Sequence, residues 1–270
     1  TLPLEAIAIP KPLLEILQKR LTRLLPVQSR SVKAGLLEER NQLVVSATAT
    51  GKSLVGEMAG IKNLLENKGK LLFLVPLVAL ANQKYDQLSA YRELGYQISI
   101  RIGVSRIRLG KGRNIPQSLQ ADIIAGTYEG LDQVIRTKKS LGKVGTVVID
   151  EVHMLEDAER GHRLAGMIAR LKNAAPNAQF IFLSATVGNP AALAKRLGAT
   201  LVEYEVRSVP IERHIIFSSG PEKRKLLRQL SKEAQALTSS TGYRGQTIIF
   251  TNSRKNCYNL ADAIPGAAAY

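Results

Sequence analysis

The stretch QLVVSATATGKS, residues 42–53, decides the fold. Its first part, QLVVS, has the apolar and β-branched residues of a buried strand, and Ser53 begins an amphipathic segment that predicts a helix to Glu66. A loop of small residues lies between them and ends in Gly51 and Lys52. This order places backbone N–H groups at a helix N-terminus, where anionic oxygens bind. The stretch therefore predicts a phosphate-binding loop in an α/β domain.

The loop residues suggest how a nucleoside triphosphate is held. Lys52 can reach the β and γ phosphates, and the Ser53 hydroxyl can ligate Mg²⁺. The loop departs from the pattern GxxxxGK[ST] at its first position, Ser46, and Ala49 stands where many such loops have glycine, although small residues still fit. The candidate ATP-binding residues are Thr48, Ala49, Thr50, Gly51, Lys52 and Ser53.

The rest of the chain repeats the alternation of strand and helix. Apolar strand-like runs are LLFLV, QISI, DIIAG, TVVID, QFIFLS and TLVEYEV, followed by HIIF and TIIF. Amphipathic segments between them cover residues 53–66, 80–94, 161–171 and 190–197. This alternation is typical of βαβ units, so we expect a mainly parallel sheet with helices on both faces.

Two adjacent carboxylates, Asp150 and Glu151, end the apolar run in VGTVVIDEVH. Ligands of open parallel sheets bind beyond the carboxyl ends of such strands. Asp150 would hold the metal and its water, and Glu151 would orient and deprotonate the attacking water. The alternative is a simple helix cap at a strand exit. The phosphate-binding loop in the same chain favours the catalytic interpretation, with Lys52 as the third catalytic residue.

Composition points to a polyanionic partner. The formal net charge is +16, and excess Lys and Arg attract nucleic acid and release its counterions. A general solubility charge is the alternative. We find no apolar run long enough to span a bilayer and no secretion signal, and Cys257 is the only cysteine, so we expect no membrane partner and a cytoplasmic setting.

The domain organisation follows from the spacing of these elements. We expect an ATP-binding α/β domain over residues 1–208, with residues 1–40 as an N-terminal segment of it. A Ser-Val-Pro connection follows near Arg207. Residues 209–270 supply too few elements for an independent core, so we interpret them as the incomplete beginning of a second domain.

A series of short motifs resembles the DExH branch of superfamily 2 helicases, closest to the archaeal repair and RNA-processing group. In chain order they are LLPVQ (Q motif), SATATGKS (motif I), LVPLVALANQKY (Ia), AGTYEG (Ib), DEVH (II), EDAERGHRL, LSAT (III) and IIFTNSR (IV). Any one of these motifs alone is weak evidence for the family. Their order and spacing together indicate the family. Nothing after IIFTNSR resembles motif V or the arginine-rich motif VI, so this resemblance supplies no arginine finger.

The resemblance implies that residues 1–208 form a RecA-like domain and that residues 209–270 begin a second RecA-like domain. It also implies further site residues. The amide of Gln28 would read the adenine edge. A nucleic-acid strand would contact motifs Ia and Ib through Pro76, Leu77, Ala79, Thr127 and Glu129. Motif III would couple the two surfaces through Ser184 and Thr186, with His153 as partner. His162 and His214 have no such context. The basic segment Arg101–Arg113 is either a solvated face or an added phosphate contact, with Arg106 and Arg108 as candidates.

These observations favour an ATP- and Mg²⁺-dependent nucleic-acid helicase whose second motor half is incomplete here, leaving this part weakly active or inactive alone. DNA is favoured over RNA because LVPLVALANQKY and ERGHRL resemble the archaeal repair enzymes. An RNA helicase of the same superfamily and a non-unwinding, ATP-gated nucleic-acid clamp are the alternatives. The sequence does not tell the oligomeric state.

Overall fold

The computed structural model describes residues 1–103, 118–137, 139–206, 212–239 and 242–269. The chain forms two compact units, residues 1–210 and 211–270, which we describe separately. The strands of the first unit are β1 (Gln42–Ser46), β2 (Lys70–Val75), β3 (Ile98–Arg101), β4 (Ile123–Thr127), β5 (Val144–Ile149), β6 (Gln179–Ser184) and β7 (Thr200–Tyr204).

Its helices fall into α-helices and short 3-10 helices. The α-helices are α1 (Lys11–Gln18), α2 (Pro26–Lys33), α3 (Ser53–Leu65), α4 (Val78–Leu88), α5 (Tyr128–Arg136), α6 (Gly161–Ala174) and α7 (Pro190–Leu197). The 3-10 helices are η1 (Leu4–Ala6), η2 (Ser89–Leu94) and η3 (Val152–Glu156). The helix expected over residues 80–94 is therefore divided into α4 and η2.

The strands of the first unit form one seven-stranded sheet in the order β3-β4-β2-β5-β6-β1-β7. Every pairing is parallel. The central strands β1, β4, β5 and β6 are buried along their whole length, as expected for a sheet covered on both faces. The α/β class and the parallel sheet predicted from the sequence are confirmed.

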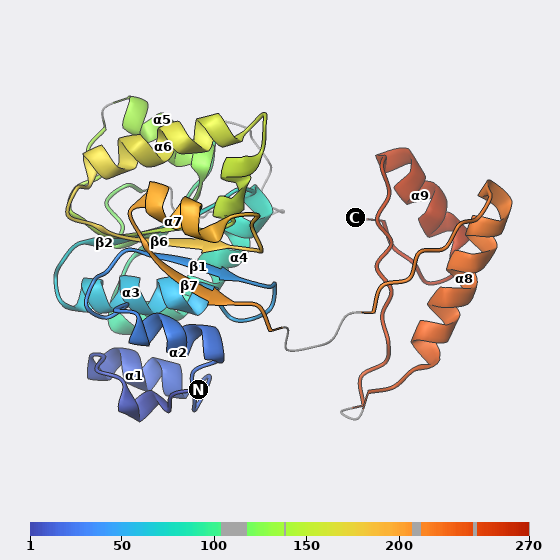
Figure 1. Ribbon diagram of the computed structural model, residues 1–270, viewed down its shortest axis with the longest axis horizontal. Coiled ribbons are helices and arrows are strands. Elements are labelled where there is room, and N and C mark those ends of the chain that lie inside the picture. Colours follow the sequence, from blue (N-terminus) through green and yellow to red (C-terminus); the bar gives the residue numbers. More distant parts are fainter. Residues whose placement is uncertain (104–117, 138, 207–211, 240–241, 270) are drawn as a thin grey trace. The chain divides into compact units, whose positions relative to one another are not determined.

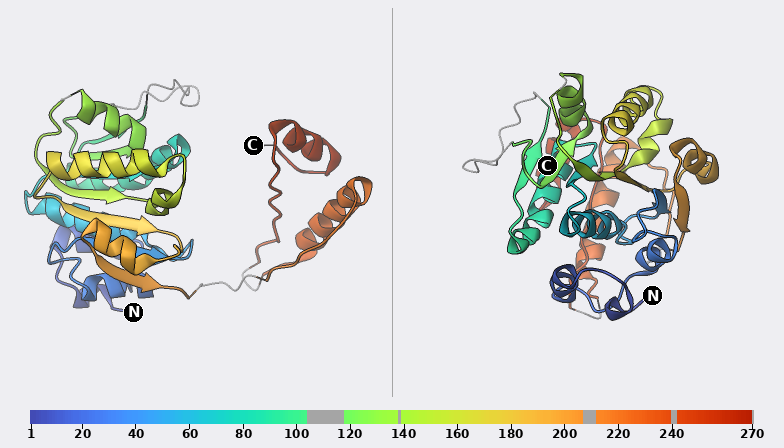
Figure 2. Two further views of the ribbon diagram at one scale, coloured as in Figure 1. Left: turned by 45° about the horizontal axis from the view of Figure 1, so that its top comes forward. Right: turned by 90° about the vertical axis from the view of Figure 1, so that its left-hand side faces the viewer.

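Helices cover both faces of the sheet and create two apolar cores (Figures 1 and 2). Helices α1 to α4 pack on one face, where Leu17, Met58 and Tyr91 are buried. Helices α5 to α7 pack on the other face around Leu131 and Leu171. The strands thus carry apolar side chains on both faces, which explains why they appear in the sequence as continuous apolar runs.

Helix α3 lies unusually close to the sheet. A Cβ atom on Gly56 would come within 2.7 Å of a methyl group of Val148, and one on Gly60 within 2.5 Å of Leu71 Cδ1. Neither position has room for a side chain without a shift of its neighbour. This close contact fixes the helix that begins at the predicted phosphate-binding loop.

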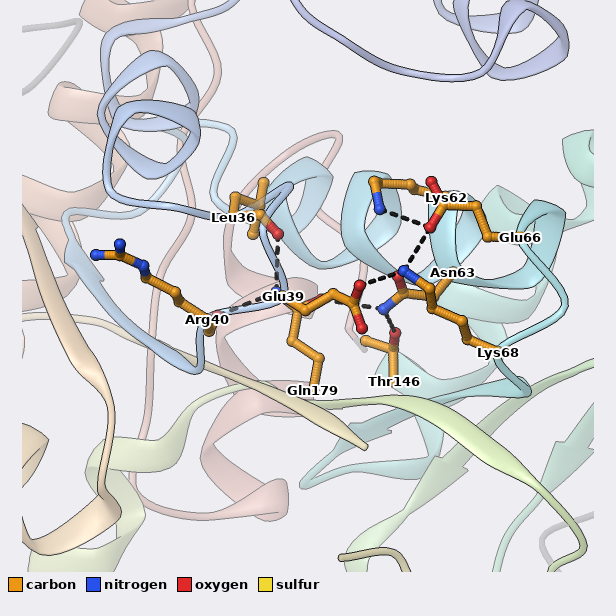
Figure 3. A network of polar contacts seen from close by, with 9 residues as sticks. All are labelled: Leu36, Glu39, Arg40, Lys62, Asn63, Glu66, Lys68, Thr146 and Gln179. Carbon is orange, nitrogen blue, oxygen red and sulfur yellow. Dashed lines mark hydrogen bonds and ion pairs between the residues drawn. The ribbon is translucent and has the colours of Figure 1, made fainter. Parts of the chain in front are cut away.

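The amino ends of β5 and β6 are closed by a polar network (Figure 3). Asn63 Nδ2 donates to Thr146 Oγ1 at 2.8 Å and to Gln179 Oε1 at 3.1 Å. Gln179 Nε2 in turn donates to the carbonyl oxygens of Leu36 and Arg40. These bonds tie α3 and the segment after α2 to the sheet, so the amino edge is filled by the chain's own groups.

The second unit contains α8 (Gly220–Ala236) and α9 (Arg254–Ala263). The strands predicted at HIIF and at Thr247–Thr251 are wrong, because neither segment is a strand in the described part of this unit. Their side chains are exposed, with Phe217 at 94% and Phe250 at 92%. A strand needs a neighbour to satisfy its backbone groups and bury its side chains, and the described residues of this unit provide none.

Candidate nucleotide and nucleic-acid site

The carboxyl edge of the sheet brings the predicted motifs together. The order β4-β2-β5-β6-β1 places motifs Ib, Ia, II, III and I next to one another in that sequence. Val45 pairs with Ser184, and Ile149 pairs with Phe182, so β6 separates the phosphate-binding loop from Asp150. On the other side of β5, Val75 pairs with Thr127. The topology therefore joins two candidate surfaces that share motif II.

The loop between β1 and α3 is held in shape by its own hydroxyl groups. Ser46 Oγ and Thr50 Oγ1 are 2.7 Å apart, and Thr50 Oγ1 donates to the carbonyl oxygen of Ala47 at 2.9 Å. In the described part of the chain, no side chain caps the N-terminus of α3, where Lys52 is the N-cap residue. An uncapped helix N-terminus leaves N–H groups available to an anion. Ser46, the departure from the consensus, thus has a structural role in this loop.

Two loop residues have positive φ angles, Ala49 at 62° and Gly51 at 80°. An L-residue with a side chain is strained in this region by about 1–2 kcal/mol. This explains why glycine is common at the position of Ala49. At Gly51 a Cβ atom would also lie 2.6 Å from Gln28 Nε2 and 2.7 Å from Leu25 Cδ1.

We expect Gly51→Ala to lower the free energy of unfolding by about 1–3 kcal/mol, because it adds backbone strain and two close contacts. Ala49→Gly is the matched control, since it relieves strain at an exposed position while adding backbone freedom, and should stay within about 1 kcal/mol of the parent. Urea denaturation followed by circular dichroism measures both. Equal stability of Gly51→Ala and the parent would contradict the loop geometry.

Gln28 connects the predicted Q motif to this loop. It lies in the first turn of α2 and is 3% exposed. Its Nε2 donates to the carbonyl oxygen of Gly51 at 2.9 Å, and its Oε1 accepts from the Leu25 backbone N–H at 2.8 Å. An amide has a second hydrogen and a second lone pair, which leaves one donor and one acceptor position for a purine edge.

The two carboxylates of motif II have different surroundings. Asp150 is buried, and its backbone N–H donates to the Leu74 carbonyl at 2.8 Å. Its own carbonyl oxygen accepts from the Tyr128 hydroxyl. The Glu151 side chain is 28% exposed, and its residue has φ 55°. Strain of this kind collects at functional sites. Asp150 is therefore fixed and enclosed, whereas the Glu151 side chain is partly exposed.

The electrostatics of Asp150 favour a cation beside it. Burial raises the pKa of Asp150, and the Glu151 charge raises it further, while Lys84 and Lys52 act in the opposite direction. The oxygen donors Asp150 and Ser53 suit Mg²⁺. Across the described ranges, no group of three or more His, Cys, Asp or Glu side chains could hold a metal. Phosphate oxygens and water would have to complete the coordination.

The predicted contact between motif III and His153 is not formed in this structure. Neither Ser184 Oγ nor His153 Nδ1 has a hydrogen-bond partner among the residues that the structure describes, although both atoms are buried. The 3-10 helix η3 brings that nitrogen to 3.2 Å from Glu151 Oε2, although without hydrogen-bond geometry. Thr186 is exposed. The imidazole therefore lies beside Glu151, and the two unpaired atoms leave the proposed coupling role of these residues open to test.

The predicted strand contacts of motifs Ia and Ib are only partly accessible. Leu77, Ala79 and Glu129 are exposed, and Pro76 is half-buried. Thr127 differs from the expectation, because it is 2% exposed and its Oγ1 accepts from the Gly130 N–H as the cap of α5. Arg106 and Arg108, like the rest of residues 104–117, lie outside the described residues.

A buried charge cluster around Glu57 was not foreseen. Glu57 is fully buried on α3, where its Oε1 accepts from Gln87 Nε2 at 2.5 Å and its Oε2 accepts from the Tyr91 hydroxyl at 3.1 Å. Arg20 Nη1 lies 3.6 Å from Oε2. Burial raises the pKa of Glu57, and Lys84 and Arg20 partly offset this. The signal was visible, because Glu57 interrupts the otherwise apolar segment SLVGEMAGI.

Comparison with known proteins identifies the family. The sequence model of the DEAD/DEAH box helicases matches residues 25–193, more than half of the chain. The chain belongs to the DEAD/DEAH box helicase family. Among the described residues, none of the helices has the length and apolar character needed to cross a membrane.

Relatives of this DEAD/DEAH box chain are known in archaea. A probable ATP-dependent helicase of Methanocaldococcus jannaschii is 52% identical over 264 residues, covering 97% of this chain and 32% of that protein. The ATP-dependent DNA helicase Hel308 of Pyrobaculum calidifontis is 39% identical, over 94% of this chain and 36% of that protein. The chain thus spans about a third of the length of these relatives.

Solved structures show the same fold. The DUF1998 helicase MrfA bound to DNA superposes with a TM-score of 0.69 at 21% identity, covering 95% of this chain and 38% of that chain. The Mycobacterium smegmatis helicase Lhr bound to single-stranded DNA and AMP-PNP gives 0.67 at 23% identity, over 94% of this chain and 35% of that chain. At these identities the likeness concerns the fold of the DEAD/DEAH box domain.

Proposed function

We propose that this chain is the ATP-binding and strand-binding part of an ATP-dependent nucleic-acid helicase. The observation that carries the proposal is the order of motifs along one sheet edge. Motif II, on β5, lies between the phosphate-binding loop side and the motif Ia and Ib side. In this proposal motif II therefore lies next to both the ATP phosphates and the residues that contact the strand, so the two surfaces can be coupled along the sheet edge.

In this proposal the chain's own residues divide the work. Lys52 and the N-terminus of α3 bind the β and γ phosphates, and Gln28 contacts the base. Ser53 and Asp150 would hold Mg²⁺, which neutralises phosphate charge when bound. Glu151 orients the attacking water and takes its proton, since it is the exposed carboxylate of the pair.

The strand surface is assigned to motifs Ia and Ib. Pro76, Leu77, Ala79 and Glu129 lie at the ends of β2 and β4, where backbone groups and a helix N-terminus can contact phosphates. DNA is the favoured polymer, because two of the archaeal relatives that match this chain are named DNA helicases. RNA remains the alternative, since backbone contacts of this kind exist in both polymers.

A competition experiment tests the function. We expect the chain to bind single-stranded DNA with little sequence preference, to bind equal-length RNA more weakly, and to lose affinity steeply as salt rises. ATP hydrolysis by the intact protein should rise when DNA is added. Two results together would contradict the proposal: the chain binds neither polymer, and ATP hydrolysis by the intact protein rises with neither DNA nor RNA. If the intact protein bound nucleic acid in an ATP-dependent way but did not separate strands, the non-unwinding, ATP-gated clamp would be favoured.

A further inference from the structure

A cleft of about 870 Å³ lies beside the predicted strand surface. It is formed by α5, α6, η3 and the loop that leads from β2 into α4. Pro76, Leu77 and Glu129 line it, and these are also predicted contacts of motifs Ia and Ib. The cleft is therefore continuous with the surface along which a strand is proposed to run.

The floor of the cleft is apolar. Tyr128, Met154, Leu164 and Met167 line it, and all but Met154 are buried from solvent by the surrounding helices. Leu77 is 53% exposed at its mouth. Thioether and leucine side chains provide polarizable, adaptable contacts for a flat apolar group. The volume is ample for a nucleobase with its sugar.

The rim of the cleft carries unpaired positive charge. Arg160 and Arg163 are exposed, and neither forms an ion pair with a described residue. Asp132 is already neutralised, since Arg170 Nη2 lies 2.5 Å from its Oδ1 and Arg136 Nε lies 2.8 Å from its Oδ2. Glu129 is the other acid that lines the cleft, and it lies in the first turn of α5, where the helix dipole favours it. Outside the lining, Asp157 Oδ1 accepts the Arg160 backbone N–H. An anionic occupant thus fits the rim.

We propose that this cleft receives one nucleotide of the bound single strand, with the base on the apolar floor and the neighbouring phosphates against Arg160 and Arg163. The inference rests on the proposed function and extends it, because contacts of motifs Ia and Ib with the backbone do not require a base site. Tyr128 lies in the floor of the cleft, and its hydroxyl donates to the carbonyl oxygen of Asp150. Tyr128 would thus link a nucleotide in the cleft to motif II.

Abasic scanning tests the base contact. A single abasic site is moved along a short oligothymidylate, and the affinity of the chain is measured by fluorescence anisotropy at each position. We expect one position at which loss of the base weakens binding about fivefold or more, as for other base-stacking contacts. Met154→Ala should reduce that positional effect while leaving the affinity for the fully abasic strand unchanged.

The phosphate contacts are tested by charge removal with a matched control. Arg160→Ser combined with Arg163→Ser should flatten the slope of log affinity against log salt by about 1.4, which is two contacts at about 0.7 each. Lys195→Ser with Arg196→Ser removes the same charge from exposed positions on α7 and should leave the slope near the parent value. Circular dichroism shows whether each variant is folded.

The outcomes separate this inference from the proposed function. Two results would each overturn the cleft assignment alone. One is strand binding with no position-dependent abasic effect, and the other is an unchanged salt slope in the folded Arg160 and Arg163 variant. Either result would favour a protein segment as the occupant of the cleft. A parent chain that binds no single strand would overturn both.

Discussion

Glu151→Gln in the intact protein is expected to bind ATP with the affinity of the parent and to hydrolyse it at least about a hundredfold more slowly. The substitution keeps the size and hydrogen-bonding capacity of the side chain and removes the group that accepts a proton from water. Asp150 cannot replace it, because that carboxylate is buried behind β5 and its Oδ1 accepts the Glu151 backbone N–H at 2.9 Å.

The geometry around Glu151 supports this expectation. The positive φ of 55° turns the residue out of the strand direction and leaves its carboxylate partly exposed. Glu156→Gln is a suitable control, because Glu156 is an exposed acid on the same short helix η3 and outside the proposed site. Single-turnover hydrolysis, with nucleotide affinity from calorimetry, measures the effect. Parent-like hydrolysis by Glu151→Gln would show that the water is activated by another group.

The sequence predicts the first unit well because its signals are local. A strand buried on both faces is continuously apolar, as in QLVVS and TVVID, and a small-residue loop followed by Lys52 and Ser53 has few other uses. Adjacent strands then bring motifs together by a rule of topology. The strand prediction at Thr247–Thr251 is wrong for the opposite reason. Its local pattern is that of a strand, but pairing requires neighbours that the described second unit does not contain.

Contacts between distant segments were the harder part of the site. The sequence does not assign a role to Glu57, because its partners Arg20, Gln87 and Tyr91 are all 30 or more positions away and no spacing rule connects them. The same holds for Tyr128 after β4, which contacts the Asp150 carbonyl after β5 across the intervening strand β2. A buried acid in an apolar segment can be noticed in the sequence, but its partners become visible only when the tertiary structure is known.

Lys52→Ala is expected to weaken ATP binding by at least about tenfold, or about 1.4 kcal/mol. Lys52 is 8% exposed at the N-cap of α3, and its charge partly offsets the rise in the pKa of Asp150 that burial causes. The ammonium therefore lies where it can pair with phosphate oxygens near motif II. An alanine leaves the uncapped N–H groups of α3 in place, so some affinity for the anion should remain.

The measurement for Lys52→Ala is isothermal titration calorimetry with ATP and Mg²⁺. Lys195→Ala serves as the control, because it removes an equal charge from an exposed position on α7. If general electrostatic attraction by the +16 charge dominated, the two variants would lose affinity equally and the loss would vanish at high salt. A specific contact in an enclosed loop is screened much less, so the difference between the variants should persist. Equal affinities of Lys52→Ala and the parent would remove the basis for assigning residues 46–53 as the phosphate-binding loop.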